Sequence, residues 1–284
     1  MAASGFLDTF AQQLLGLAFA NQTLTNAIPS TWYLALSTSA PTAAAGGIVE
    51  PVGNGYARQA IAQSAWNNPS GSGTVSIANT NAIQYPVSSG SWGTILGWVL
   101  YDALTSGNPW FFGQLASGVS VPSGRVFQFA AGEVINQLVS ASGPFTGFTD
   151  FGASALLKGV LKGTAFGFPT FWYLGVSTSA PTAAGGFTEP TAASYARLQI
   201  TRSSTQFPTA GSGATTVTIA NLLARQMATV GSPGWGTLIG WGLYDASTTG
   251  NLWLSGSMTS LTPAVGEAVY VPSGGLIATL QSST

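Results

Sequence analysis

Hydrophobic positions at helical spacing open each half of the chain. The spacings of three to five residues predict an amphipathic helix of about 15 residues in each half. An aspartate near each start (Asp8, Asp150) favours a helix N-terminus, and Pro29 and Pro169 prevent the helix from continuing. The apolar positions are Phe6, Phe10, Leu14 and Leu17 in the first half and Phe148, Phe151, Leu156 and Val160 in the second.

Short segments rich in aromatic and β-branched residues follow each helix, separated by Gly, Ser and Pro every eight to twelve residues. This spacing predicts antiparallel strands in a β-sandwich or jelly roll rather than βαβ units. Residues 97–101 are the most apolar segment, so we expect a central strand there. In the first half the predicted strands cover residues 32–37, 56–62, 74–78, 82–85, 97–101, 110–115, 125–129 and 134–138.

The two halves are copies of one unit. Residues 31–44 (TWYLALSTSAPTAA) return as 171–184 (FWYLGVSTSAPTAA), and 92–103 (WGTILGWVLYDA) return as 235–246 (WGTLIGWGLYDA). The sequence therefore predicts a mainly β chain with two tandem antiparallel β-sandwich (jelly-roll-like) domains, 1–142 and 143–284. Each is preceded by its short helix. The linker at Ser140–Pro144 is short, so we expect the copies to pack closely.

Composition narrows the class of function. Only 5% of the residues are charged against about 25% in an ordinary protein, so a surface of small neutral groups suits a permanent assembly. The net charge of −1, without a basic run, argues against nucleic acid as a partner. The chain has no Cys and no His, which removes thiolate metal sites, the usual zinc ligand and the usual general base. Its carboxylates are too dispersed for a calcium loop, so no cofactor or metal is expected.

No targeting or membrane segment is recognised. The opening residues MAASGFLDTF lack the basic region of a signal peptide, and no stretch of about 20 residues is apolar enough to span a bilayer. We therefore expect a soluble protein without a membrane partner.

Four charged positions are shared by the copies: Asp8/Asp150, Glu50/Glu189, Arg58/Arg197 and Asp102/Asp245. One interpretation is a glycosidase that uses Glu50 with Asp102, or their copies, as paired carboxylates. The other, which we favour, is a structural charge network of Glu50, Arg58, Asp102, Glu189, Arg197 and Asp245. In it the arginine is held by a carboxylate and pins loops, while the aspartate caps backbone N–H groups before a Gly-Asn turn.

Tryptophan is also shared, in the pairs Trp32/Trp172, Trp92/Trp235, Trp98/Trp241 and Trp110/Trp253. At strand positions these residues are expected in the core, although exposed indoles could stack on sugars. Trp66 has no Trp partner and lies on a predicted loop, so it is the candidate for an interaction specific to the first copy.

The copies also differ, which would suit two different neighbours. Lys158, Lys162, Arg202 and Arg225 occur only in the second copy. The first copy has Phe127 and Phe129 where the second has Val269 and Val271.

The shared motifs as a set resemble a family of tailed-bacteriophage virion proteins of the tail-fibre, minor-tail or capsid-decoration type. They lie at Tyr33–Thr42, Gly46–Pro51, Tyr56–Arg58, Trp92–Thr94, Leu100–Ala103 and Gly107-Asn108. They recur at Tyr173–Thr182, Gly185–Pro190, Tyr195–Arg197, Trp235–Thr237, Leu243–Ala246 and Gly250-Asn251.

The resemblance implies a non-enzymatic virion component that assembles in the host cytoplasm. Its partners would be other copies of itself, with a trimer favoured, and other virion proteins. An alternative is a host receptor or glycan-binding module that uses exposed aromatics such as Trp66.

Overall fold

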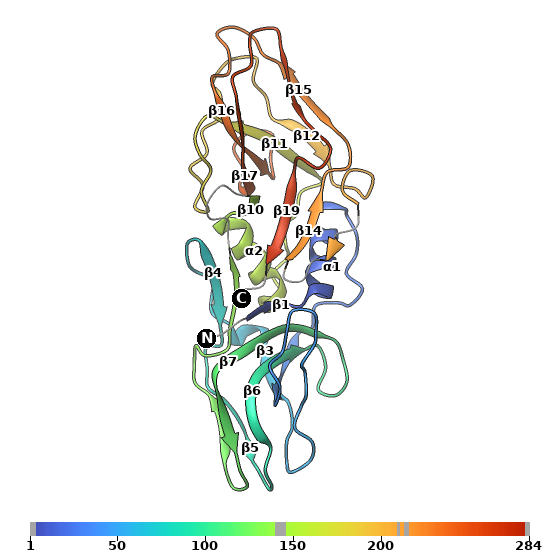
Figure 1. Ribbon diagram of the computed structural model, residues 1–284, viewed down its shortest axis with the longest axis vertical. Coiled ribbons are helices and arrows are strands. Elements are labelled where there is room, and N and C mark those ends of the chain that lie inside the picture. Colours follow the sequence, from blue (N-terminus) through green and yellow to red (C-terminus); the bar gives the residue numbers. More distant parts are fainter. Residues whose placement is uncertain (1–3, 140–145, 209–210, 213–215, 282–284) are drawn as a thin grey trace.

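The computed structural model describes residues 4–139, 146–208, 211–212 and 216–281 (Figure 1). The predicted linker at Ser140–Pro144, and with it the domain boundary at 142/143, falls outside the described residues and stays a prediction.

Residues 4–139 of the first repeat contain one α-helix, a short 3-10 helix and nine strands. In chain order they are β1 (Ser4–Phe6), α1 (Asp8–Phe19), β2 (Thr31–Ser37), β3 (Gln59–Ala62), η1 (Gln63–Ala65), β4 (Thr74–Ala78), β5 (Ile83–Val87), β6 (Gly93–Tyr101), β7 (Pro109–Val121), β8 (Val126–Phe129) and β9 (Ile135–Val139).

The second repeat follows the same order except that the two-residue strand β13 stands where the first repeat has η1. Its elements are β10 (Thr146–Phe148), α2 (Asp150–Lys162), β11 (Phe171–Ser177), β12 (Leu198–Thr201), β13 (Gly211–Ser212), β14 (Thr216–Ala220), β15 (Arg225–Thr229), β16 (Leu238–Tyr244), β17 (Leu252–Leu261), β18 (Ala268–Val271) and β19 (Ile277–Gln281).

Both repeats build the same antiparallel sheets, which confirms the predicted fold class. The large sheet has the order β1-β7-β6-β2-β3 in the first repeat and β10-β17-β16-β11-β12 in the second. β4 pairs with β9 and β5 with β8, and their equivalents β14–β19 and β15–β18 pair likewise. β6 lies at the centre of its sheet, as its apolar sequence predicts.

The indole of Trp98 on β6 explains one fixed position of the neighbouring strand. Trp98 is paired in register with Gly113 on β7. A Cβ atom at Gly113 would lie 2.3 Å from the Trp98 ring, so only glycine fits beneath the indole. Trp241 and Gly256 repeat this relationship in the second copy.

Both predicted helices form and begin at Asp8 and Asp150. Phe6 and Phe148, however, lie just before them in the three-residue strands β1 and β10, which pair with β7 and β17. The four-residue step from Phe6 to Phe10 matches helical spacing, which is why the sequence places Phe6 on the helix. Phe151, expected on the buried face of α2, is 43% exposed.

Each helix packs on its own repeat and also on the other one, and we call this crossing the helix exchange. Within their own repeats, Phe10 of α1 contacts Trp110 and Phe111 of β7, and α2 contacts β10 and β17. α1 packs against β13, β14 and β19 of the second repeat, and α2 packs against η1, β4 and β9 of the first. Figure 1 shows the result: both helices lie in the waist of an elongated molecule, with the large sheet of each repeat toward opposite ends. One hydrophobic core runs through the waist and contains residues of both repeats.

Stacked and edge-on aromatic rings fill this shared core. Phe19 at the end of α1 lies 5.5 Å, between ring centroids, from Trp172 of the second repeat and 5.4 Å from Phe207. The eight paired tryptophans are all at most 5% exposed, which confirms their predicted place in the core.

Candidate functional site

The shared arginine of each repeat binds a carboxylate and a turn at the same time. Arg58, just before β3, contacts Glu50 through two hydrogen bonds: Nη2 to Oε1 at 2.5 Å and Nε to Oε2 at 3.1 Å. Its remaining Nη1 donates to the backbone carbonyls of Ala103 (2.8 Å) and Ser106 (2.7 Å) in the β6–β7 loop. Burial alone would lower the pKa of Arg58, but the bond to Glu50 outweighs it and raises that pKa.

Two tyrosines complete the surroundings of this ion pair. Tyr56 donates its hydroxyl hydrogen to Glu50 and accepts one from the backbone N–H of Leu36 on β2. The Arg58 guanidinium carbon lies 3.6 Å from the centre of the Tyr101 ring, in cation–π contact. Burial, followed by the negative charge of Glu50, raises the pKa of Tyr56 well above its usual value, so this hydroxyl keeps its proton.

Asp102 holds the other side of the same loop. Its carboxylate accepts hydrogen bonds from Asn108, through the backbone N–H (2.7 Å) and the side-chain amide (2.8 Å), and from Trp110 Nε1 (3.1 Å). Ser106 and Gly107 between them are left-handed, with φ of 54° and 73°. A Cβ at Gly107 would lie 2.5 Å from Asp102 Oδ1, so this close approach requires glycine.

The second repeat reproduces these contacts. Arg197 binds Glu189 and donates to the carbonyls of Ala246 and Thr249. Asp245 accepts from both N–H groups of Asn251 and from the Trp253 indole. The structure thus brings all six residues singled out by the sequence into two equivalent clusters, one per repeat.

The contacts of the carboxylates do not favour the glycosidase hypothesis. A glycosidase needs one carboxyl group that keeps its proton to protonate the leaving group. Partial burial alone would raise the pKa of Asp102, but the hydrogen bonds from Asn108 and Trp110 hold that pKa below its usual value. Asp102 is therefore ionised at neutral pH, and Glu50 is bound to Arg58 and Tyr56.

Trp66 lies inside the molecule, so the expectation that it is an exposed loop aromatic is wrong. It is 1% exposed and follows η1, which contacts α2 of the other repeat. The equivalent position in the second repeat holds another buried aromatic, Phe207, which packs on Phe19 of α1. An aromatic is present in both copies because it fills the space beside the exchanged helix, and a comparison of aromatics rather than of Trp alone would have found it.

Two of the basic residues found only in the second copy hold the repeats together. Lys162, at the end of α2, donates to the backbone carbonyl of Trp66. Arg202, just after β12, donates to the Asn21 side chain (2.7 Å) and to the Pro169 carbonyl (2.9 Å). The proposal that these residues face external neighbours is therefore wrong for Lys162 and Arg202.

Asp150 also links the two repeats, because its carboxylate accepts a hydrogen bond from the backbone N–H of Gly73 in the first repeat at 3.0 Å. Across the described residues, Asp and Glu form no group of three that could hold a metal ion. Nor does any helix in the described part of the chain have the length and apolar character needed to cross a membrane.

The fold and these contacts define a tandemly repeated β-sandwich protein whose shared charged residues bind the chain itself. A family model described as podophage GP4 fiber I protein gp80 matches residues 5–137 and matches again over residues 147–279. The chain belongs to this family, as a tandem duplication, and is a phage virion structural protein of the fibre type. This confirms the resemblance to tailed-phage virion proteins. Comparison with curated protein sequences gives no significant match.

Proposed function

We propose that this chain is a non-enzymatic building block of a phage tail appendage and assembles with other copies of itself. A trimer is the favoured form, and decoration of the capsid is the alternative location. The proposal rests on one observation: most of the charged side chains shared by the repeats, or lying between them, bind groups of the same chain. The ion pair of each repeat, its capping aspartate and the junction cations all bind within the chain. Little charge is left on the surface to oppose close packing between copies.

We further propose that Glu50, Arg58 and Asp102, with Glu189, Arg197 and Asp245, act as structural clamps. Each clamp holds one β6–β7 or β16–β17 loop in a left-handed turn that a non-glycine residue adopts at a cost of about 1–3 kcal/mol. In this role the network shapes a loop that stays the same in both copies, while the rest of the surface diverges.

The partners of the chain are other virion proteins, since it belongs to a fibre family. Assembly before release from the host would place its folding in the host cytoplasm, which suits a chain without cysteine.

The test is cryo-electron microscopy of intact particles together with light scattering of the purified chain. The expected result is density for this fold on the tail and an oligomer, with three chains the favoured number. Particles that lack this density altogether, with a chain that stays monomeric at high concentration, would contradict the proposal.

A further inference from the structure

The two ends of the molecule carry equivalent turns with opposite charge. In Figure 1, β5 lies toward one end of the long axis and β15 toward the other. The strands that pair with them, β8 and β18, begin just after turns that end in Arg125 and Glu267. These two residues are equivalent because their backbone carbonyls accept hydrogen bonds from the equivalent residues Ser88 and Val230.

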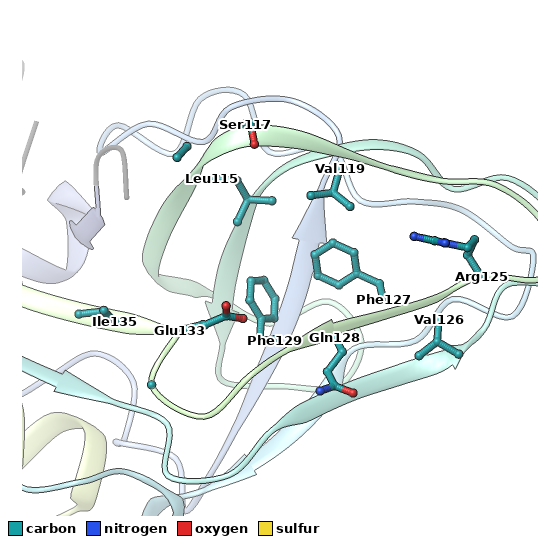
Figure 2. A pocket seen from close by; sticks show the side chains of 12 residues that line it. Leu115, Ser117, Val119, Arg125, Val126, Phe127, Gln128, Phe129, Glu133 and Ile135 are labelled. Atoms are coloured by element: carbon teal, nitrogen blue, oxygen red, sulfur yellow. The ribbon is translucent and has the colours of Figure 1, made fainter.

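The Arg125 end contains an open groove. The groove lies between the outer part of β7 and the strand β8 and has a volume of about 670 Å³. Phe127, Phe129 and Leu115 point into it, as Figure 2 shows. Arg125 lies toward one end, and Glu133, whose carboxylate accepts the backbone N–H of Ala130, lies toward the other. In the described residues β1 covers β7 only as far as Gly113, and β8 has β5 as its one strand partner. Within the described part of the chain, both walls of the groove therefore have a strand edge without a further partner.

The Glu267 end presents apolar side chains instead. Val265, in the turn between β17 and β18, is 59% exposed, and Tyr270 on β18 is 60% exposed. Both lie within three residues of Glu267 in the sequence. Glu267 is exposed, and one of its carboxylate oxygens accepts the backbone N–H of Ala264. This end therefore offers what the groove lacks: projecting apolar groups beside a carboxylate.

We propose that the chains associate head to tail, with the β17–β18 turn of one copy seated in the β7–β8 groove of the next. Val265 would then lie against the floor made by Phe127 and Phe129, and Glu267 would approach Arg125 of the neighbouring copy. The inference rests on the proposed self-association and specifies which two surfaces of the chain meet.

Charge argues for this pairing over the symmetric ones. Two second-repeat ends brought together would bring two Glu267 carboxylates into one interface. Two first-repeat ends would offer Arg125 the Glu133 of the other groove, a carboxylate already bonded to the Ala130 N–H. Like charges that face each other across an interface cost several kcal/mol, whereas the head-to-tail contact pairs opposite charges. A head-to-tail contact joins different surfaces. It closes into a ring, as the favoured trimer requires, when successive rotations close, and otherwise repeats along a line.

The test is sedimentation velocity of the full chain, with Arg125→Glu and Glu267→Arg made separately. Each variant should associate at least about tenfold more weakly than the parent chain, because every contact then pairs like charges. An equal mixture of the two variants should recover association, since each contact between unlike variants again pairs opposite charges. Higher salt should weaken the parent assembly.

Lys158→Glu is the matched control, because it makes the same change of charge at an exposed position on α2, in the waist. It should leave association unchanged. Glu267→Gln keeps an acceptor for the turn and removes only the charge, so it separates a misfolded turn from a lost contact.

The outcomes distinguish this inference from the proposed function. An oligomer that resists both charge reversals, or a mixture that associates no better than its components, would overturn the head-to-tail contact and leave self-association intact. A parent chain that is monomeric at every concentration would overturn both.

Discussion

The indole of Trp172 in the second repeat donates a hydrogen bond to the backbone carbonyl of Ala18 in the first, over 3.0 Å in the buried waist. The equivalent indole of Trp32 has no hydrogen-bond partner within the described residues, although it is equally buried. The contact between the two repeats in the waist therefore pairs equivalent elements, but its hydrogen bonds differ on the two sides.

This asymmetry makes Trp172→Phe and Trp32→Phe a matched pair. Both changes remove a similar amount of buried ring, but only Trp172→Phe leaves a buried carbonyl without its donor. We expect Trp172→Phe to lower the free energy of unfolding by about 1 kcal/mol more than Trp32→Phe, as measured by urea denaturation. Equal losses in the two variants would contradict a role for this hydrogen bond.

The shared core predicts that the two repeats unfold together. Phe19→Ala removes a fully buried ring that packs on Trp172 and Phe207 across the junction, so it should cost about 3–5 kcal/mol. Calorimetry should show one transition that shifts as a whole to lower temperature. Leu104→Ala, at a half-exposed loop position, should change stability by less than about 0.5 kcal/mol. A second-repeat transition that keeps its parent temperature in Phe19→Ala would contradict joint unfolding.

The clamp predicts that arginine cannot be replaced by lysine. Arg58→Lys keeps the charge but loses the two-point bond to Glu50 and cannot reach both loop carbonyls, so we expect a loss of about 1–3 kcal/mol. Arg197→Lys should cost a similar amount, because its contacts are the same. Arg125→Lys, at an exposed position, serves as the control and should leave the free energy of unfolding unchanged. A clamp variant as stable as this control would argue against the structural role.

The lowered pKa of Asp102 predicts that this residue affects how the free energy of unfolding depends on pH. The folded pKa of Asp102 lies below its usual value, so the unfolded chain binds the proton more tightly. Its contribution to stability is therefore present above a pH of about 4 and is lost as the pH falls through the folded pKa. Asp102→Asn should be less stable at pH 7 by about 1–3 kcal/mol, and the difference from the parent should shrink toward pH 2.

The parent chain and Asp102→Asn are compared at each pH, which separates the effect of Asp102 from that of Asp8. Burial raises the pKa of Asp8, so its contribution to stability changes with pH in the opposite direction. Denaturant melts at several pH values provide the measurement. A difference that stays constant from pH 7 to pH 2 would show that the charge of Asp102 contributes nothing.

Much of the fold follows from the sequence because each element has its own periodic signal. The β4 strand is predicted to the residue, and the apolar run in β6 marks the centre of the sheet. β1 and β10 are missed because three residues are too few for an alternating pattern to stand out from the helix that follows.

The exchange of the helices could not be predicted from the pattern. The apolar face of α1 shows that it must be covered, but the two repeats offer nearly the same covering surface. Which repeat supplies it depends on how the chain is connected through the waist. The burial of Trp66 is a consequence of that exchange, so a local analysis of its loop places it at the surface.

The exchanged helices also have a mechanical consequence. Tension applied between the two ends of this chain would pass through the waist. Because each helix contacts both repeats, separating the ends would break the cross-repeat contacts of α1 and α2, including the bond from Trp172 to Ala18. These contacts would share the load with the covalent connection between the repeats.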